Sequence, residues 1–212
     1  MPTSTPSQAS LFDDDAAGAS LPPLAGPPGF RYETGFLSPD EESDLLAHMA
    51  GLPFEAMRYK AYVAQRRVVS YGGRFDFDRN QLLATDAPAP WVLPLQHRIA
   101  AWVGLPPHAF TQVLVAEYSP GTPLGWHRDV PDFEDVVGVS LAGEATMRFR
   151  PYRRNGQPVS RADVLKYTLA PRSIYLLRGP ARWDWQHSVS PTRSLRYSIT
   201  FRTSARRVPA KR

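Results

Sequence analysis

The chain has 212 residues, a length that suits a single domain with a substantial core. It contains no cysteine, which excludes disulfides, zinc–thiolate sites and thiol catalysis, so a bound metal would need nitrogen and oxygen ligands. The net charge of +5 favours a polyanionic partner, and no apolar run is long enough to predict a membrane span. We expect a monomeric intracellular protein of the bacterial, cytoplasmic type that does not engage a membrane.

Both ends of the chain are predicted to lie outside the folded domain. Residues 1–28 are rich in Pro, Ser, Ala and Gly, a composition that buries too little apolar surface to order itself. We expect a disordered leader there, one domain over residues 29–205 and a basic tail over residues 206–212. A basic tail of this kind is as often a solvated end as a contact for nucleic acid.

Two helices are predicted in the first half of the domain, after a short strand at Phe30–Tyr32. Residues 38–41 read Ser-Pro-Asp-Glu, a capping box with proline at the first helical position, and the helix should run to about Ala50. A second helix is expected over Trp91–Val103, where apolar residues recur at helical spacing before Gly104 ends the pattern.

Residues 54–79, between these helices, interleave aromatic and basic side chains, with Tyr71-Gly72-Gly73 as a tight turn between two strand-like runs. Aromatic surfaces beside positive charge suit a flipped or unpaired base. A hairpin whose aromatics are half-buried in the core accounts for the same pattern. Taken alone, the segment favours the hairpin.

From residue 111 the sequence breaks into short runs of β-forming residues separated by Gly, Pro and Asn. The runs are Gln112–Tyr118, Val136–Leu141, Ala145–Arg150, Val164–Leu169, Ser173–Arg178, Trp183–Val189 and Leu195–Thr203. So many strands in about ninety residues predict a double-sheet barrel or jelly roll over residues 111–203. We expect an α+β, mainly β, fold whose helices are confined to the N-terminal half and brace one sheet from outside.

The central motif is His127-Arg128-Asp129. Residues two apart on a strand point the same way, so this imidazole and this carboxylate could converge on one point. His187, 58 residues after Asp129 in an aromatic segment, fits as a third ligand. Two histidines and one carboxylate with open positions opposite form the facial triad of non-haem Fe(II) oxygenases.

Arg196 and Arg202 are six residues apart, so both side chains leave the same face of a strand. Two guanidinium groups side by side suit a dicarboxylate. Together with iron ligands, such a clamp implies 2-oxoglutarate as co-substrate.

The second half of the chain resembles the AlkB-type Fe(II)/2-oxoglutarate dioxygenases, which act on alkylated nucleic-acid bases. The resemblance covers residues 112–203 and extends less firmly to residues 30–79. It rests on Tyr118-x-Pro-Gly, Gly125-Trp-His-x-Asp129, Val139-Ser-Leu141, Trp183 to His187, and Arg196 to Arg202.

This resemblance implies a double-stranded β-helix with a nucleotide-recognition lid over residues 54–79. The Fe(II) ligands would be His127, Asp129 and His187. The residues that would hold 2-oxoglutarate are Tyr118, Arg196, Ser198 and Arg202. Phe77, with Phe75, would stack on the damaged base over the His127 ring, and Arg66 and Arg67 would touch backbone phosphates; Tyr71 and Trp126 complete the expected substrate set.

Two positions depart from the family pattern. Ala116 stands two residues before the motif tyrosine, where the family often has Asn, so a hydrogen bond to the co-substrate is missing or comes from elsewhere. Ser198 stands two residues after the first clamp arginine, again where Asn is common, and keeps a hydroxyl.

The function that follows is an oxidative demethylase that uses Fe(II), 2-oxoglutarate and O2 to remove N-alkyl groups from bases of single-stranded DNA or RNA. It would release formaldehyde and succinate. One alternative is the same oxidative chemistry on a tRNA modification or a protein side chain, although the aromatic–basic segment favours a nucleic acid. The other is a non-catalytic jelly-roll module that binds nucleic acid, against which the intact ligands and clamp argue.

Overall fold

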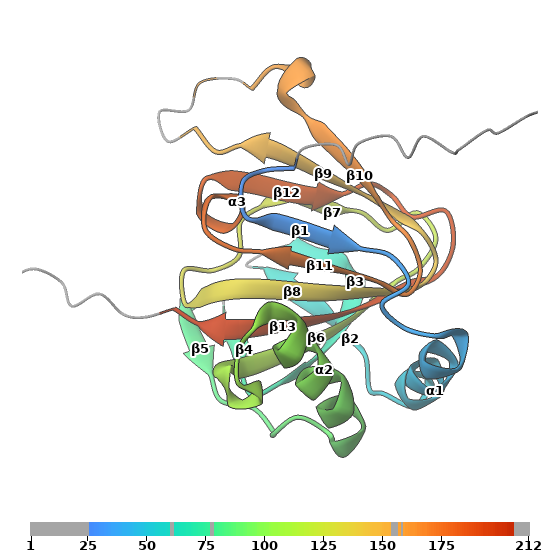
Figure 1. Cartoon of the computed structure of the whole chain (residues 1–212). Coiled ribbons are helices and arrows are strands. Elements are labelled where there is room, and N and C mark those ends of the chain that lie inside the picture. Colours follow the sequence, from blue (N-terminus) through green and yellow to red (C-terminus); the bar gives the residue numbers. More distant parts are fainter. Residues whose placement is uncertain (1–25, 60–61, 77–78, 154–156, 158, 206–212) are drawn as a thin grey trace, which may run out of the picture.

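In the computed structural model, which describes residues 26–59, 62–76, 79–153, 157 and 159–205, two antiparallel β-sheets face each other (Figure 1). The seven-stranded sheet runs in the order β1 (Phe30–Glu33), β11 (Ser173–Leu177), β8 (Phe133–Ala142), β13 (Arg196–Ser204), β6 (Phe110–Tyr118), β3 (Tyr62–Tyr71) and β2 (Glu55–Tyr59). The four-stranded sheet runs β10 (Leu165–Leu169), β9 (Ala145–Pro151), β12 (Trp185–Val189) and β7 (Leu124–His127). This is the predicted jelly roll.

The helices α1 (Pro39–Ala50) and α2 (Leu93–Val103) lie against the outer face of the seven-stranded sheet, below it in Figure 1. The predicted capping box is present, because the Ser38 hydroxyl accepts from the Glu41 amide while the Glu41 carboxylate accepts from the Ser38 amide. Turns of 3-10 helix at Pro90–Val92 and Pro107–Ala109 flank α2. Both predicted helices are confirmed.

Alternation along β13 divides its side chains between two environments. Ile199 and Phe201 are fully buried in the core that the seven-stranded sheet forms with α1 and α2. Arg196, Ser198 and Arg202 point the other way, toward the four-stranded sheet, and are also buried. Because side chains alternate along a strand, one segment builds the apolar core and presents polar groups to the space between the sheets.

Helical turns also occur in the second half of the chain, which corrects the expectation that helices are confined to the first. They are α3 (Pro180–Trp183) and a 3-10 turn at Arg161–Asp163. The strand expected from Trp183 begins only at Trp185, because the amides of Trp183 and Asp184 donate to the carbonyls of Gly179 and Pro180 and close a helical turn.

The segment predicted as a lid has two parts. β2 and β3 form a hairpin that extends the seven-stranded sheet beside β6, and β4 (Arg74–Asp76) pairs with β5 (Gln81–Leu83) in a separate small sheet. The predicted turn is present at Gly72, which has a φ of +75°. A Cβ atom at this position would lie 2.2 Å from the Thr111 carbonyl oxygen, so both the backbone conformation and the lack of space require glycine.

The leader predicted over residues 1–28 lies almost wholly outside the described residues, as does the tail over residues 206–212. Within the described parts of the chain, no helix is both long enough and apolar enough to cross a membrane.

Candidate metal centre and co-substrate pocket

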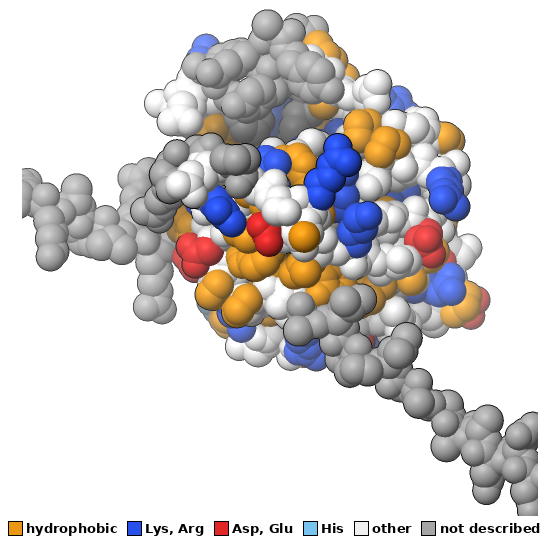
Figure 2. Space-filling view, turned by 90° about the horizontal axis from the view of Figure 1, so that it is seen from above, with side chains coloured by type: hydrophobic (Ala, Val, Ile, Leu, Met, Phe, Trp, Pro, Cys, Tyr) orange, Lys and Arg blue, Asp and Glu red, His pale blue; other side chains and the backbone are white. Residues whose placement is uncertain are grey.

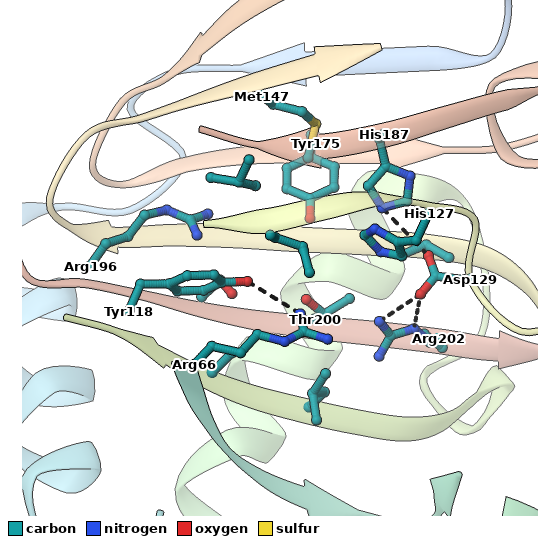
Figure 3. A pocket seen from close by; sticks show the side chains of 16 residues that line it. Arg66, Tyr118, His127, Asp129, Met147, Tyr175, His187, Arg196, Thr200 and Arg202 are labelled. Carbon is teal, nitrogen blue, oxygen red and sulfur yellow. Dashed lines mark hydrogen bonds and ion pairs between the residues drawn. The ribbon is translucent and has the colours of Figure 1, made fainter. Parts of the chain in front are cut away.

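His127, Asp129 and His187 converge between the two sheets (Figure 3). His127 ends β7 and lies directly opposite His187 of β12 in the strand register, which brings the two ring centroids to 4.2 Å. Asp129 follows two residues later. One ligand atom from each of the three side chains lies within 4.8 Å of the others, so the triad could hold one metal ion.

Hydrogen bonds orient the three groups. His127 Nδ1 lies 2.9 Å from the Gly125 carbonyl oxygen, which can only accept, so Nδ1 carries the proton and Nε2 keeps its lone pair. Arg202 donates from Nε and Nη2 to Asp129 Oδ1 at 3.2 and 2.9 Å. The other oxygen, Oδ2, is buried without a hydrogen-bond partner, 3.9 Å from His187 Nε2. A divalent cation would satisfy this oxygen, so the residues fit a metal.

The surroundings of the triad lower the pKa of all three side chains. Burial by itself would raise the pKa of Asp129, but Arg202 and the two histidines hold it far below its ordinary value. Burial and the neighbouring His127 lower the pKa of His187 to about 3, and burial likewise lowers the pKa of His127. All three groups are therefore deprotonated at neutral pH, as metal ligation requires.

A polar pocket extends from the triad between the sheets, and Arg196 and Arg202 stand at its opposite ends (Figure 3). This corrects the expectation that the two guanidinium groups lie side by side. A strand advances about 3.3 Å per residue, so a spacing of six residues places the Cα atoms of the two arginines about 20 Å apart. Arg202 is engaged by Asp129 and, through Nη1, by Gln112 Oε1 at 2.8 Å.

Arg196 forms the other end of the pocket and is only 1% exposed. Its Nε donates to Ser140 Oγ at 3.0 Å, whereas its Nη1 is buried with no hydrogen-bond partner. A buried guanidinium with an unused donor that faces a polar cavity is suited to a carboxylate.

Tyr118 lies beside Arg196, whose Cζ is 4.9 Å from the centre of the phenol ring. Its hydroxyl accepts from Arg66 Nη1 at 3.5 Å. Burial would raise the pKa of Tyr118, but the positive charges of Arg66 and Arg196 outweigh it and lower that pKa. Ala116 and Ser198, the two departures from the family pattern, face each other across β6 and β13 and both line the pocket.

Among the residues predicted to bind substrate, Arg66 lies in the pocket. Arg67, its neighbour on β3, points to the other face and forms an ion pair of 2.7 Å with Glu117. A contact of Arg66 with backbone phosphate therefore has no support from its position, and for Arg67 such a contact stays a prediction.

The predicted aromatic residues lie away from the pocket lining. Tyr71 packs against the core beneath the seven-stranded sheet, and Phe75 is half-buried in β4. Trp126 faces outward from β7, beside Arg148 and Arg150. Phe77 lies outside the described residues.

Two residues of the site had no predicted role: Tyr175, which lines the pocket, and Ser140, which accepts the hydrogen bond from Arg196 Nε. The Tyr175 side chain projects into the pocket from β11, and burial raises its pKa to about 12 (Figure 3). The sequence feature that accompanies this side chain is Gly138. A Cβ atom at position 138 would lie 2.2 Å from Tyr175 Cζ, and a glycine inside a strand often marks such a close approach. Ser140 is a single polar residue in the apolar run of β8.

Residues 29–202 match a family model described as the 2OG-Fe(II) oxygenase superfamily. Over 171 residues the chain is 30% identical to the tRNA (carboxymethyluridine(34)-5-O)-methyltransferase alkbh8 of Xenopus tropicalis, an alignment that covers 78% of this chain and 26% of that protein. Over 183 residues it is 31% identical to the Alkylated DNA repair protein ALKBH8 homolog of Arabidopsis thaliana, covering 76% of this chain and 51% of that one. The chain thus spans a quarter to a half of these relatives.

Two solved structures share the fold. OsALKBH1 superposes with a TM-score of 0.63 at 19% identity and covers 84% of this chain and 98% of that one. A prolyl hydroxylase of Trichoplax adhaerens, in complex with a peptide of hypoxia inducible factor, superposes with a TM-score of 0.54 at 16% identity and 83% coverage of both chains. The family match over residues 29–202, together with the His-Asp-His triad, shows that the chain belongs to the 2OG-Fe(II) oxygenase superfamily, and its similarity to the two ALKBH8 relatives supports the AlkB-type resemblance.

Proposed function

We propose that the protein is an oxidative demethylase that removes N-alkyl groups from bases of single-stranded DNA or RNA. The observation that carries this proposal is the pocket, in which a metal-binding triad and a buried arginine lie at opposite ends of one cavity. The choice of a nucleic acid is supported by the Arabidopsis relative, which is named as an alkylated DNA repair protein.

We assign the roles from the pocket geometry. His127, Asp129 and His187 would hold Fe(II), which together with 2-oxoglutarate and O2 supplies the oxidising power. Arg196 would bind the distal carboxylate of 2-oxoglutarate through its unused Nη1, and this arginine is flanked by Tyr118 and Ser198. Arg202 would hold Asp129 in place through Oδ1, so that Oδ2 stays free to bind the metal.

The reaction balances as an oxygen insertion. One atom of O2 enters the N-methyl group, which becomes N-hydroxymethyl, and the other enters 2-oxoglutarate, which loses CO2 and becomes succinate. The hydroxymethyl group then leaves as formaldehyde and the base nitrogen regains a proton. The protein contributes by positioning the reactants and excluding water between two closely packed sheets.

A second candidate is hydroxylation of a modified tRNA base without loss of a carbon atom. The Xenopus relative is named for a tRNA carboxymethyluridine, which favours this possibility. The two functions differ in products, because hydroxylation gives succinate and an oxidised nucleoside but no formaldehyde.

The deciding experiment reconstitutes the protein with Fe(II) under anaerobic conditions, adds 2-oxoglutarate, air and methylated single-stranded oligonucleotides, and measures formaldehyde and succinate together. Equal amounts of both, abolished in Asp129→Ala and retained in the surface control Asp163→Ala, would support the demethylase. Succinate with an oxidised nucleoside and no formaldehyde would favour the tRNA hydroxylase. Absence of succinate from iron-loaded, folded protein would contradict both.

A further inference from the structure

The outer face of the four-stranded sheet carries a cluster of aromatic and cationic side chains. Arg148 and Arg150 of β9 flank the indole of Trp126 on β7, with Cζ atoms 5.0 and 4.5 Å from its ring centre. Next to them, Arg128 Cζ lies 3.6 Å from the ring centre of Tyr152. We call these five residues the arginine–tryptophan face.

Strand alternation turns these side chains away from the pocket. On β9, Met147 and Phe149 are fully buried between the sheets, so Arg148 and Arg150 must project outward. On β7, the register shift between Leu124 and His127 lets both of these residues line the pocket, and the contacts of Trp126 with Arg148 and Arg150 place its indole on the outer face. Figure 2 looks at the molecule from the side of this sheet and shows basic side chains among hydrophobic ones.

The charge on this face lacks acidic partners. Arg148 Nε donates to Ser188 Oγ at 3.0 Å and Arg150 Nε donates to Gln186 Oε1 at 2.7 Å, both neutral acceptors. Among the described residues, no carboxylate oxygen lies within 4.0 Å of the guanidinium nitrogens of Arg128, Arg148 or Arg150. Eight other arginines do form such ion pairs: Arg31, Arg67, Arg79, Arg98, Arg153, Arg172, Arg178 and Arg202. Guanidinium groups gathered around one indole repel each other, and a bound polyanion would relieve this repulsion.

The face is continuous with the metal centre. β7 is the edge strand of its sheet, and the adjacent residues Trp126 and His127 point to its opposite sides. A nucleic-acid strand that crosses this edge could place one base in the pocket and the next nucleotides on the outer face.

We propose that the arginine–tryptophan face binds the sugar–phosphate chain of single-stranded nucleic acid next to the base that enters the pocket. Arg148 and Arg150 contact phosphates, and the Trp126 indole stacks on a base. Guanidinium groups beside an aromatic ring are the combination that binds single strands without sequence preference. The inference rests on the proposed function only for the choice of a nucleic acid.

The first test measures binding of an unmodified single-stranded oligonucleotide of about 12 nucleotides to the full chain by fluorescence anisotropy at several salt concentrations. Each phosphate contact contributes about 0.7 to the slope of log K against log salt. Arg148→Gln and Arg150→Gln should each lower that slope by about 0.7, and the double variant by about 1.4.

The matched control is Arg31→Gln, which removes the same charge from a similar pair. Arg31 Cζ lies 3.9 Å from the ring centre of Trp102, on the helix-covered side of the molecule, and this variant should keep the wild-type slope. The variant Arg148→Lys with Arg150→Lys keeps both charges and should retain most of the slope, even if the Gln double variant folds poorly. A wild-type slope in folded Arg148→Gln and Arg150→Gln would overturn the inference.

The second test separates this face from the reaction itself. The double Gln variant should show a raised KM for a methylated oligonucleotide of about 12 nucleotides, but the wild-type KM for a methylated trinucleotide too short to reach the face. If no methylated base is turned over but the salt slope depends on Arg148 and Arg150, the demethylase fails and the binding face stands. If demethylation occurs and the double variant has the wild-type KM for both substrates, the face fails and the demethylase stands.

Discussion

The two carboxylate oxygens of Asp129 have different surroundings. Arg202 holds Oδ1 with two hydrogen bonds, and Oδ2 is buried with no partner beside His187. A buried carboxylate is costly when it is charged and unpaired, and the arginine offsets that cost on one side only. The carboxylate is therefore fixed in orientation while its second oxygen remains free for a cation.

The lowered pKa of His187 predicts how the metal-free protein responds to acid. The unfolded chain takes up a proton on this histidine below pH 6.5, whereas the folded protein, with a pKa of about 3, does not. The free energy of unfolding should therefore fall as pH falls from 6.5 toward 3, by about 2 kcal/mol at pH 5 from this group. Urea unfolding at pH 7 and pH 5 measures the loss, which should be smaller in His187→Gln; an equal loss in both proteins would contradict the assignment.

Arg66 and Arg67 are neighbours on β3 with opposite environments, which makes them a matched pair. Arg66 reaches the Tyr118 hydroxyl in the pocket, whereas Arg67 pairs with Glu117 outside it. Arg66→Gln should raise the KM for 2-oxoglutarate about tenfold, since a charge-assisted hydrogen bond contributes about 1.5 kcal/mol, and Arg67→Gln should leave it unchanged. Succinate formation without nucleic acid measures both, and an unaltered KM in Arg66→Gln would limit this residue to substrate contacts.

At the scale of elements, β8 shows how one small residue shapes the pocket. Gly138 lies in the middle of this strand opposite Tyr175 on β11, and the phenol ring occupies the space that any larger side chain would need. The ring is thereby free to project between the sheets toward the metal centre (Figure 3). A glycine that weakens the strand is kept here by close packing.

Gly138→Ala should therefore displace the Tyr175 ring, because the new Cβ would lie 2.2 Å from its Cζ atom. Overpacking of this kind costs about 1–3 kcal/mol of the free energy of unfolding. Urea unfolding gives the loss, and the double variant with Tyr175→Ala should lose less than the sum of the two single variants. Strict additivity would mean that the two residues do not compete for space.

At the scale of the whole molecule, the proposed ligands bridge the two sheets. The histidines come from β7 and β12 of the four-stranded sheet, and the arginines at both ends of the pocket come from β13 of the seven-stranded sheet. A metal ion with 2-oxoglutarate would connect both sheets through the space between them. Binding should therefore stabilise the fold as a unit.

Mn(II) with 2-oxoglutarate, each at about 100 times its dissociation constant, should add about 2.7 kcal/mol or more to the free energy of unfolding. For a domain of this size that corresponds to a rise in Tm of about 5–10 °C, measured by thermal denaturation without oxygen. Asp129→Ala should show little of the rise from Mn(II), and Arg196→Gln little of the additional rise from 2-oxoglutarate. An equal rise in wild type and Asp129→Ala would exclude the triad as the metal site.

The sequence by itself determined the features that depend on near neighbours. The capping box at Ser38, the turn at Gly72 and the shared direction of Arg196 and Arg202 all follow from local geometry, and the structure contains each of them. The spacing of His127 and Asp129 likewise predicted two groups that could meet at one point, because two residues suffice to define it.

Only the tertiary structure decided where distant segments meet. It set His187 opposite His127 across two strands, turned Arg66 into the pocket and Trp126 away from it, and brought Tyr175 to the cavity. Strand register and sheet order fix these positions. Both depend on packing between residues far apart in the chain, which local sequence patterns do not predict. The types of residue in the site could therefore be predicted from the sequence. Which residues they contact, and which way their side chains point, depended on how the two sheets pack against each other.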